Sequence, residues 1–288
     1  MSEPCQIMYS EEYLSTMSSL KQYLETKTYT EEALQVTEEA LSLLASHYTA
    51  WCFRLDIIKH LGKDLFEELN WCEEVAIANE KNYQIWNYRQ RVIELILEDP
   101  ALAAQFQVRR ELPIFQMMIS MDEKNHHVWL YRNWFVKRFE LYDDAGELEF
   151  VNKLIDKDAR NNSAWTHKFF LLFSRNDAAE NIVAQELDFC REKIALCPQN
   201  PSLWNYLLGI YASQERLLVE LKDFCGQYAN INDEEIKSSF ALETLAKIAV
   251  EQNDVLLACR YYDLLLQKYD PIRASYWNYL SKKILLNT

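Results

Sequence analysis

Composition excludes several classes of protein. The chain has 288 residues, of which 49% are hydrophobic and only four are glycine, and its formal net charge is −14. So large an apolar fraction can bury a core, which excludes a disordered chain, and the few glycines argue against a sheet protein with many tight turns. The acidic balance argues against nucleic acid as a partner, because general nucleic-acid binders carry a basic face.

The cysteines and the apolar runs indicate whether the chain binds a metal and where in the cell it works. The seven cysteines form no C-x-x-C pair, and their number is odd. This pattern predicts free thiols, a reducing compartment and no metal site in this chain. No apolar run approaches the ~20 residues of a membrane span, and residues 1–10 lack the pattern of a signal peptide. We therefore expect a cytoplasmic protein without a membrane span.

A tryptophan-centred segment recurs along the chain at a period of about 36 residues. Its copies in chain order are SHYTAWCFR (46–54), KNYQIWNYR (81–89), KNHHVWLYR (124–132), RNNSAWTHK (160–168), QNPSLWNYL (199–207) and a last YWNY (276–279). The first five tryptophans are 35, 43, 36 and 39 residues apart. The 43-residue gap predicts extra residues at 98–110, and the long interval before 276 predicts a degenerate copy near Phe240. The polar stretch 226–235 predicts another loop.

Each copy predicts a pair of helices joined by a short turn. Asn82, Asn125, Asn161 and Asn200 are suited to cap the second helix, because an Asn side chain accepts a bond from an unpaired backbone N–H. The Trp four residues later and the Arg seven residues later share one face of that helix. Since no pair can bury its apolar stripe alone, neighbouring pairs must stack, and the sequence predicts an all-α solenoid.

The repeated pattern N-[YH]-x-x-W-x-[YFH]-R resembles the repeat of protein prenyltransferase α subunits. The segments YSEEY (9–13) and LQVTEEAL (34–41) are similar to that family as well, so the resemblance covers most of the chain. It implies a right-handed α-α superhelix, crescent-shaped, in which residues 1–288 form a single repeat domain. It also implies an α subunit that is active only with a β subunit.

The resemblance further implies a function for the pair of subunits. The β subunit would carry the catalytic zinc, and magnesium would assist in the farnesyl case. The enzyme would transfer farnesyl or geranylgeranyl from an isoprenoid diphosphate to the Cys of C-terminal C-a-a-X proteins. Two alternatives stand beside this interpretation: the α subunit of a Rab-type geranylgeranyltransferase, and a non-enzymatic helical scaffold that binds peptides. Which isoprenoid is used, and whether one or two β subunits share the chain, stay open.

The resemblance implies a catalytic role for two residues of this chain. Lys124 matches a lysine that approaches the diphosphate, and a lysine at a helix N-terminus adds to the positive end of the dipole. The simpler interpretation is a surface lysine in a turn, because Lys81 occupies the same place in the preceding copy. His126 stands where the family has Tyr near the diphosphate and the reacting thiol. An equally weighted interpretation is a histidine that packs between repeats.

Five further positions are carried over with smaller roles. Tyr83 matches a tyrosine that lines the pocket for the last peptide residues, although a core role fits it too, and His127 approaches the peptide's C-terminus. Arg132, Asn161 and Trp165 match positions that matter for activity. We expect them to act structurally, as an inter-repeat ion pair, a helix cap and a core indole, respectively.

Overall fold

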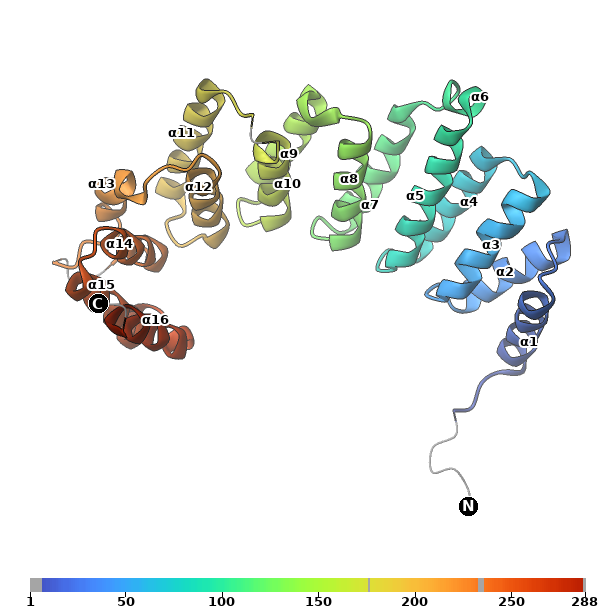
Figure 1. Cartoon of the computed structure of the whole chain (residues 1–288), viewed down its shortest axis with the longest axis horizontal. Helices are drawn as coiled ribbons and strands as arrows, with labels where there is room; N and C mark the ends of the chain where they lie inside the picture. Colours follow the sequence, from blue (N-terminus) through green and yellow to red (C-terminus); the bar gives the residue numbers. More distant parts are fainter. Residues whose placement is uncertain (1–6, 176, 233–235, 287–288) are drawn as a thin grey trace, which may run out of the picture. The chain divides into compact units, whose positions relative to one another are not determined.

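The fold is a series of helical hairpins. The structure is a computed structural model that describes residues 7–175, 177–232 and 236–286. Within these ranges every regular element is helical and no strand occurs (Figure 1). None of the helices in the described ranges is long and apolar enough to cross a membrane. The predicted all-α repeat fold is confirmed. The chain divides into two compact units, Met1–Phe139 and Glu140–Thr288, so a single domain over 1–288 stays a prediction.

The first unit contains three helical hairpins preceded by one helix. Its helices are α1 (Glu11–Thr26), α2 (Glu31–Leu43), α3 (Tyr48–Leu61), α4 (Leu65–Ala78), α5 (Tyr83–Glu98), α6 (Pro100–Ala103), α7 (Leu112–Met121) and α8 (His126–Arg138). Helix α2 pairs with α3, α4 with α5 and α7 with α8, while α3 packs on α5 and α5 on α8. The extra residues predicted at 98–110 form α6 and part of a 3₁₀ turn, Val108–Glu111.

The second unit continues the pattern with a shortened pair. Its helices are α9 (Ala145–Lys157), α10 (Asn162–Phe173), α11 (Glu180–Leu196), α12 (Pro201–Ser213), α13 (Lys222–Gly226), α14 (Ser239–Glu251), α15 (Val255–Leu264) and α16 (Ala274–Leu286). The degenerate copy predicted near Phe240 is α14, whose preceding partner α13 has only five residues. Of the loop predicted at 226–235, residues 233–235 lie outside the described ranges.

The four predicted asparagine caps are all present. The Oδ1 atoms of Asn82, Asn125, Asn161 and Asn200 each accept a backbone N–H in the first turn of the helix that follows. These caps satisfy donors that have no partner inside a helix. Each second helix therefore begins at a fixed residue, and the tryptophan four positions later enters the core. The five repeat tryptophans at 51, 86, 129, 165 and 204 are between 1% and 5% exposed.

A buried glutamate joins consecutive hairpins. The Arg89 guanidinium on α5 makes two bonds of 2.8 Å to Glu111, and the Tyr131 hydroxyl on α8 donates to the same carboxylate at 2.7 Å. The same arrangement occurs one hairpin earlier, with Arg54, Glu68 and Tyr88. It occurs again in the second unit with lysine in place of arginine, formed by Lys168, Glu186 and Tyr206. In each triad the glutamate precedes the tyrosine by 20 residues. Charged groups thus hold the stack together from inside its apolar core.

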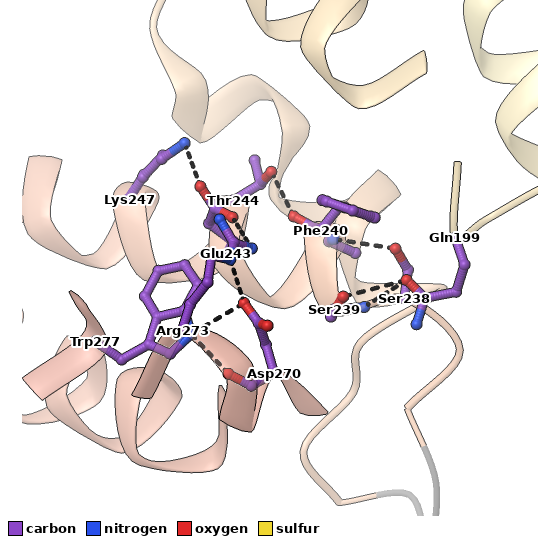
Figure 2. Close-up of polar contacts among 11 residues, drawn as sticks. Gln199, Ser238, Ser239, Phe240, Glu243, Thr244, Lys247, Asp270, Arg273 and Trp277 are labelled. Carbon is purple, nitrogen blue, oxygen red and sulfur yellow. Dashed lines mark hydrogen bonds and ion pairs between the residues drawn. The ribbon is translucent and has the colours of Figure 1, made fainter. Parts of the chain in front are cut away.

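The last hairpin also combines a buried tryptophan with ion-paired charged groups. Trp277 on α16 is fully buried, and its Nε1–H donates to Asp270 O at 3.2 Å and to Asp270 Oδ2 at 3.1 Å. Arg273 bridges that aspartate and Glu243 on α14, as Figure 2 shows. The last hairpin therefore also has an ion-paired arginine next to a buried indole, although its sequence matches the repeat pattern only at residues 276–279.

The N-terminus of α14 is tied to the turn before α12. Ser239 N and Oγ both lie 3.2 Å from Gln199 Oε1 (Figure 2), and Ser238 Oγ donates to Pro198 O at 2.6 Å. Ser238 thus combines a helix cap with a bond to the preceding repeat. Asn200 does the same through its Nδ2, which donates to Ala159 O at 2.6 Å.

Candidate functional site

Two neighbouring turns of the first unit bring the candidate residues together. The turn at 79–82 precedes α5, and the turn at 122–125 precedes α8. Asn125 Nδ2 donates to Glu80 O at 2.8 Å, and the Lys81 ammonium forms an ion pair with the Asp122 carboxylate. Because the two second helices pack side by side, their N-termini and the side chains of both turns share one edge of the unit.

Two lysines flank one carboxylate at this edge. The Lys81 ammonium lowers the pKa of Asp122 chiefly through its hydrogen bond, and the Lys124 backbone N–H, which donates to Asp122 Oδ1 at 3.0 Å, lowers it further. The same bond to Asp122 raises the pKa of Lys81. Lys81 and Lys124 are both exposed. Both lysines therefore act on the same carboxylate, one through its ammonium group and one through its backbone N–H.

Three aromatic rings complete the cluster. The ring centroids of Tyr83 and His127 lie 6.1 Å apart, and those of His126 and His127 lie 5.8 Å apart. Tyr83 is 53% exposed, so it is a surface residue and not a core residue. Burial lowers the pKa of His127, and the nearby charges of His126 and Lys81 lower it further. His127 is therefore neutral at pH 7 and contributes a hydrogen-bonding group without charge.

The arrangement is suited to binding an anion. Unpaired N–H groups give each helix N-terminus a partial positive charge, and here two such ends lie beside two lysines. An ammonium group held close to an oxygen that gains negative charge in a reaction also stabilises its transition state. Among the residues that the structure describes, no group of three or more His, Cys, Asp or Glu side chains could hold a metal ion.

Comparison with known proteins identifies the repeat. The model of the protein prenyltransferase alpha subunit repeat matches residues 30–61, 65–96, 108–139, 144–175 and 183–214. The chain belongs to the protein prenyltransferase α-subunit family. The protein farnesyltransferase/geranylgeranyltransferase type-1 subunit alpha of Candida albicans is 49% identical over 97% of this chain and 92% of that protein. The corresponding subunit of Dictyostelium discoideum is 29% identical over 96% and 85%, respectively.

A solved structure gives the same result for the fold. The chain superposes with a TM-score of 0.90 and 48% identity on the Candida albicans protein geranylgeranyltransferase-I complexed with GGPP, covering 98% of this chain and 93% of that one. The prenyltransferase α-subunit resemblance inferred from the sequence is therefore confirmed, and so is the all-α repeat fold.

Four of the carried-over residues lie in the cluster of this prenyltransferase α subunit. Tyr83, Lys124, His126 and His127 come together there. The sequence pattern assigns Lys81 no role in the site, yet its ion pair with Asp122 places it in the same cluster. The signal was present in the sequence, because Lys81 and Lys124 both directly precede a capping asparagine.

The three supporting residues are all buried. Arg132 is 2% exposed, and its guanidinium carbon lies 5.0 Å above the centroid of the Phe115 ring. Asn161 caps α10 by accepting the Ala164 N–H at 3.2 Å, and Trp165 is a core residue at 2% exposure. These placements fit the expected structural roles for Asn161 and Trp165. The inter-repeat ion pair expected for Arg132 stays a prediction.

Proposed function

We propose that this chain is the α subunit of a heterodimeric protein prenyltransferase of the farnesyltransferase/geranylgeranyltransferase type-1 kind. The pair would transfer farnesyl or geranylgeranyl from an isoprenoid diphosphate to the cysteine thiol of a C-a-a-X protein. The 49% identity over nearly the full length of the Candida albicans subunit carries this proposal. The type-2 subunit alpha of Rattus norvegicus is a weaker candidate, because its 27% identity covers only 37% of that protein.

The proposed role of the cluster is to hold the diphosphate. In the reaction, the bond between carbon 1 of the isoprenoid and the diphosphate oxygen breaks, a carbon–sulfur bond forms, and the thiol proton is lost. Negative charge grows on the leaving oxygen, and the ammonium groups of Lys124 and Lys81 stabilise it. His126 donates a hydrogen bond to the same group. Both lysines stand at the N-terminal edge of a helix, where the backbone favours an anion as well.

The proposed roles of Tyr83 and His127 concern the peptide. Tyr83 presents an exposed ring to the pocket for the last peptide residues. The neutral His127 ring beside it offers a hydrogen bond toward the peptide's C-terminus. An uncharged partner suits this position, because the lysines then remain the principal cations for the diphosphate.

The partner subunit supplies the rest of the chemistry in this proposal. The β subunit holds the zinc ion that lowers the pKa of the substrate thiol, and magnesium assists in the farnesyl case. The described residues of this chain offer no cluster of metal ligands. We further propose that the pair works in the cytoplasm, which agrees with the many free cysteines of this chain.

Coexpression tests the proposed function directly. The chain is produced alone, with a farnesyltransferase β subunit, and with a geranylgeranyltransferase type-1 β subunit. Transfer of a labelled isoprenoid to a C-a-a-X peptide is then measured for each preparation. We expect transfer with at least one β subunit and none by the chain alone. A stable monomer that associates with neither β subunit would favour the peptide-binding scaffold. A requirement for an escort protein would favour the type-2 enzyme.

A further inference from the structure

The repeat tryptophans have a polar role as well as an apolar one. In four of the five repeats, the indole Nε1–H donates to the carbonyl oxygen two residues before the cap of its own helix. The four bonds are Trp51 to Ala45 at 2.7 Å, Trp129 to Glu123 at 2.9 Å, Trp165 to Ala159 at 3.0 Å and Trp204 to Pro198 at 2.8 Å. Each bond fixes an exposed turn to a buried ring, so the turn cannot move without breaking it.

The turn that carries Lys81 lacks this bond. Trp86 is 3% exposed, and its Nε1 atom has no hydrogen-bond partner in the part of the chain that the structure describes. By the spacing of the other four repeats its acceptor would be Glu80 O, which accepts Asn125 Nδ2 at 2.8 Å. A carbonyl oxygen can accept two bonds, as Pro198 O does from Trp204 and Ser238. A buried donor without a partner destabilises a protein, so the exception at Trp86 has an energetic cost.

The same turn also lacks a hydrogen bond between a side chain and the backbone that two other turns have. Asp122 and Asp158 occupy the first position of their turns, and each accepts the backbone N–H two residues later, at 3.0 Å and 2.8 Å. Asn79 occupies that position before α5, but its Nδ2 donates backward to Val75 O at 3.1 Å. The turn at 79–82 therefore has neither the indole bond nor the side-chain bond. Its lysine is held by an ion pair to Asp122 in the neighbouring turn.

We propose that Trp86 is a positioning residue that fixes Lys81 in the ligand-bound enzyme. When a diphosphate group takes the place of Asp122 beside the Lys81 ammonium, the turn shifts and the Trp86 N–H donates to Glu80 O. The repeat then acquires the bond that the other four already have. Because this bond exists only in the bound state, its free energy adds to the affinity for the ligand. The inference rests on the proposed function, since it assumes that Lys81 meets a diphosphate.

Two matched substitutions separate this role from a purely structural one. Trp86→Phe and Trp51→Phe each keep an aromatic ring and remove an indole N–H, and both tryptophans are 3% exposed in the first unit. In the ligand-free heterodimer, W51F breaks an existing 2.7 Å bond and lowers the thermal midpoint. Both substitutions put a smaller ring into a buried site and lower the midpoint for that reason, but W86F removes a donor that has no partner, so its midpoint should fall less than that of W51F.

Ligand affinity should be affected by W86F and not by W51F. The heterodimer is titrated with geranylgeranyl diphosphate or farnesyl diphosphate, and hydrogen exchange of residues 79–83 is followed with and without the ligand. We expect W86F to raise the dissociation constant about fivefold, the effect of one ordinary hydrogen bond, and W51F to leave it unchanged. Ligand-dependent protection of residues 79–83 should occur in the wild type and in W51F but not in W86F.

The outcomes distinguish failure of the inference from failure of the proposed function. A thermal midpoint for W86F as low as that for W51F would mean that the indole is already bonded without ligand, and this would overturn the inference. The inference would also be overturned if W86F bound the ligand with wild-type affinity and showed wild-type protection of residues 79–83 from hydrogen exchange. If the wild-type heterodimer bound no isoprenoid diphosphate, the proposed function itself would fail, and the inference would fall with it.

Discussion

The Asp122 carboxylate contacts both lysines of the candidate site. It pairs with Lys81 and accepts the backbone N–H of Lys124, and both contacts keep it ionised. An incoming diphosphate therefore competes with a carboxylate that is already in place. The two lysines do not have equivalent surroundings, so their individual contributions to diphosphate binding have to be measured separately.

Substituting the lysines tests the proposed diphosphate site. We expect Lys124→Ala and Lys81→Ala each to reduce prenyl transfer by the heterodimer about tenfold or more, because a hydrogen bond to a charged group is worth ~1.5–3 kcal/mol. Lys21→Ala is the matched control, because Lys21 is an exposed lysine on α1 whose ion pair is with the exposed Glu25. Steady-state transfer rates at saturating peptide measure the effect. Wild-type rates in both site variants would remove the lysines from the mechanism.

The pKa of His127 predicts a pH dependence of stability. Burial, aided by His126 and Lys81, makes the folded pKa of His127 lower than the unfolded value. The unfolded chain then binds the proton more readily, so His127 costs stability as the pH falls below about 6.5 and costs nothing well above it. We expect the thermal midpoint of the wild type to fall more steeply than that of His127→Asn between about pH 7 and pH 5. Parallel curves for the two proteins would contradict the shifted pKa.

At the scale of elements, the helix starts could be predicted and their cross-links could not. An asparagine cap depends on a few neighbouring residues, so a sequence pattern reveals it, and all four predicted caps are present. Glu68 and Glu111 look like any other helical glutamates in the sequence. Their distances from the partner arginines, 14 and 22 residues, differ because the connecting segments differ in length. Only the folded stack shows that both are buried acceptors.

The site was predicted in part for the same reason. Tyr83, Lys124, His126 and His127 could be named because a repeat pattern assigns each a position. The pairing of Lys81 with Asp122 spans 41 residues and depends on how α5 packs on α8. No local pattern encodes that contact, so the sequence alone does not pair Lys81 with Asp122.

Asn125 has two functions that a substitution can separate. Its Oδ1 accepts the N–H groups of His127 and Val128, and its Nδ2 donates to Glu80 O in the preceding turn. We expect Asn125→Ala to destabilise the protein by about 2 kcal/mol, one part from the cap and one from the bond between turns. Asn82→Ala, which removes a cap bond to Gln84, should cost only about 1 kcal/mol. Thermal unfolding of the two coexpressed heterodimers compares them, and equal losses would argue against the bond between turns.

At the scale of the whole molecule, each repeat depends on its neighbours, and buried charges carry much of that dependence. In the first unit, α5 is joined to the following hairpin in two ways. Arg89 meets Glu111 where both side chains are fully buried, whereas Arg138 meets Glu94 where both are about 40% exposed. The two ion pairs have similar N–O distances of 2.8 Å. They differ mainly in burial, which makes them a direct test of how this unit holds together.

Removing one partner from each pair should give very different results. Glu111→Ala leaves the Arg89 guanidinium and the Tyr131 hydroxyl without their common acceptor in a dry core, and breaking a buried pair in this way costs ~3–5 kcal/mol. Glu94→Ala removes an exposed pair and should cost less than about 1 kcal/mol. Because α5 and α8 also carry the two turns of the candidate site, Glu111→Ala should abolish prenyl transfer at temperatures where Glu94→Ala keeps it. Thermal midpoints and transfer rates of the two heterodimers decide the matter. Equal midpoints would mean that apolar contacts alone hold the hairpins in register, and that the buried glutamate does not align the turns that bear Lys81 and Lys124.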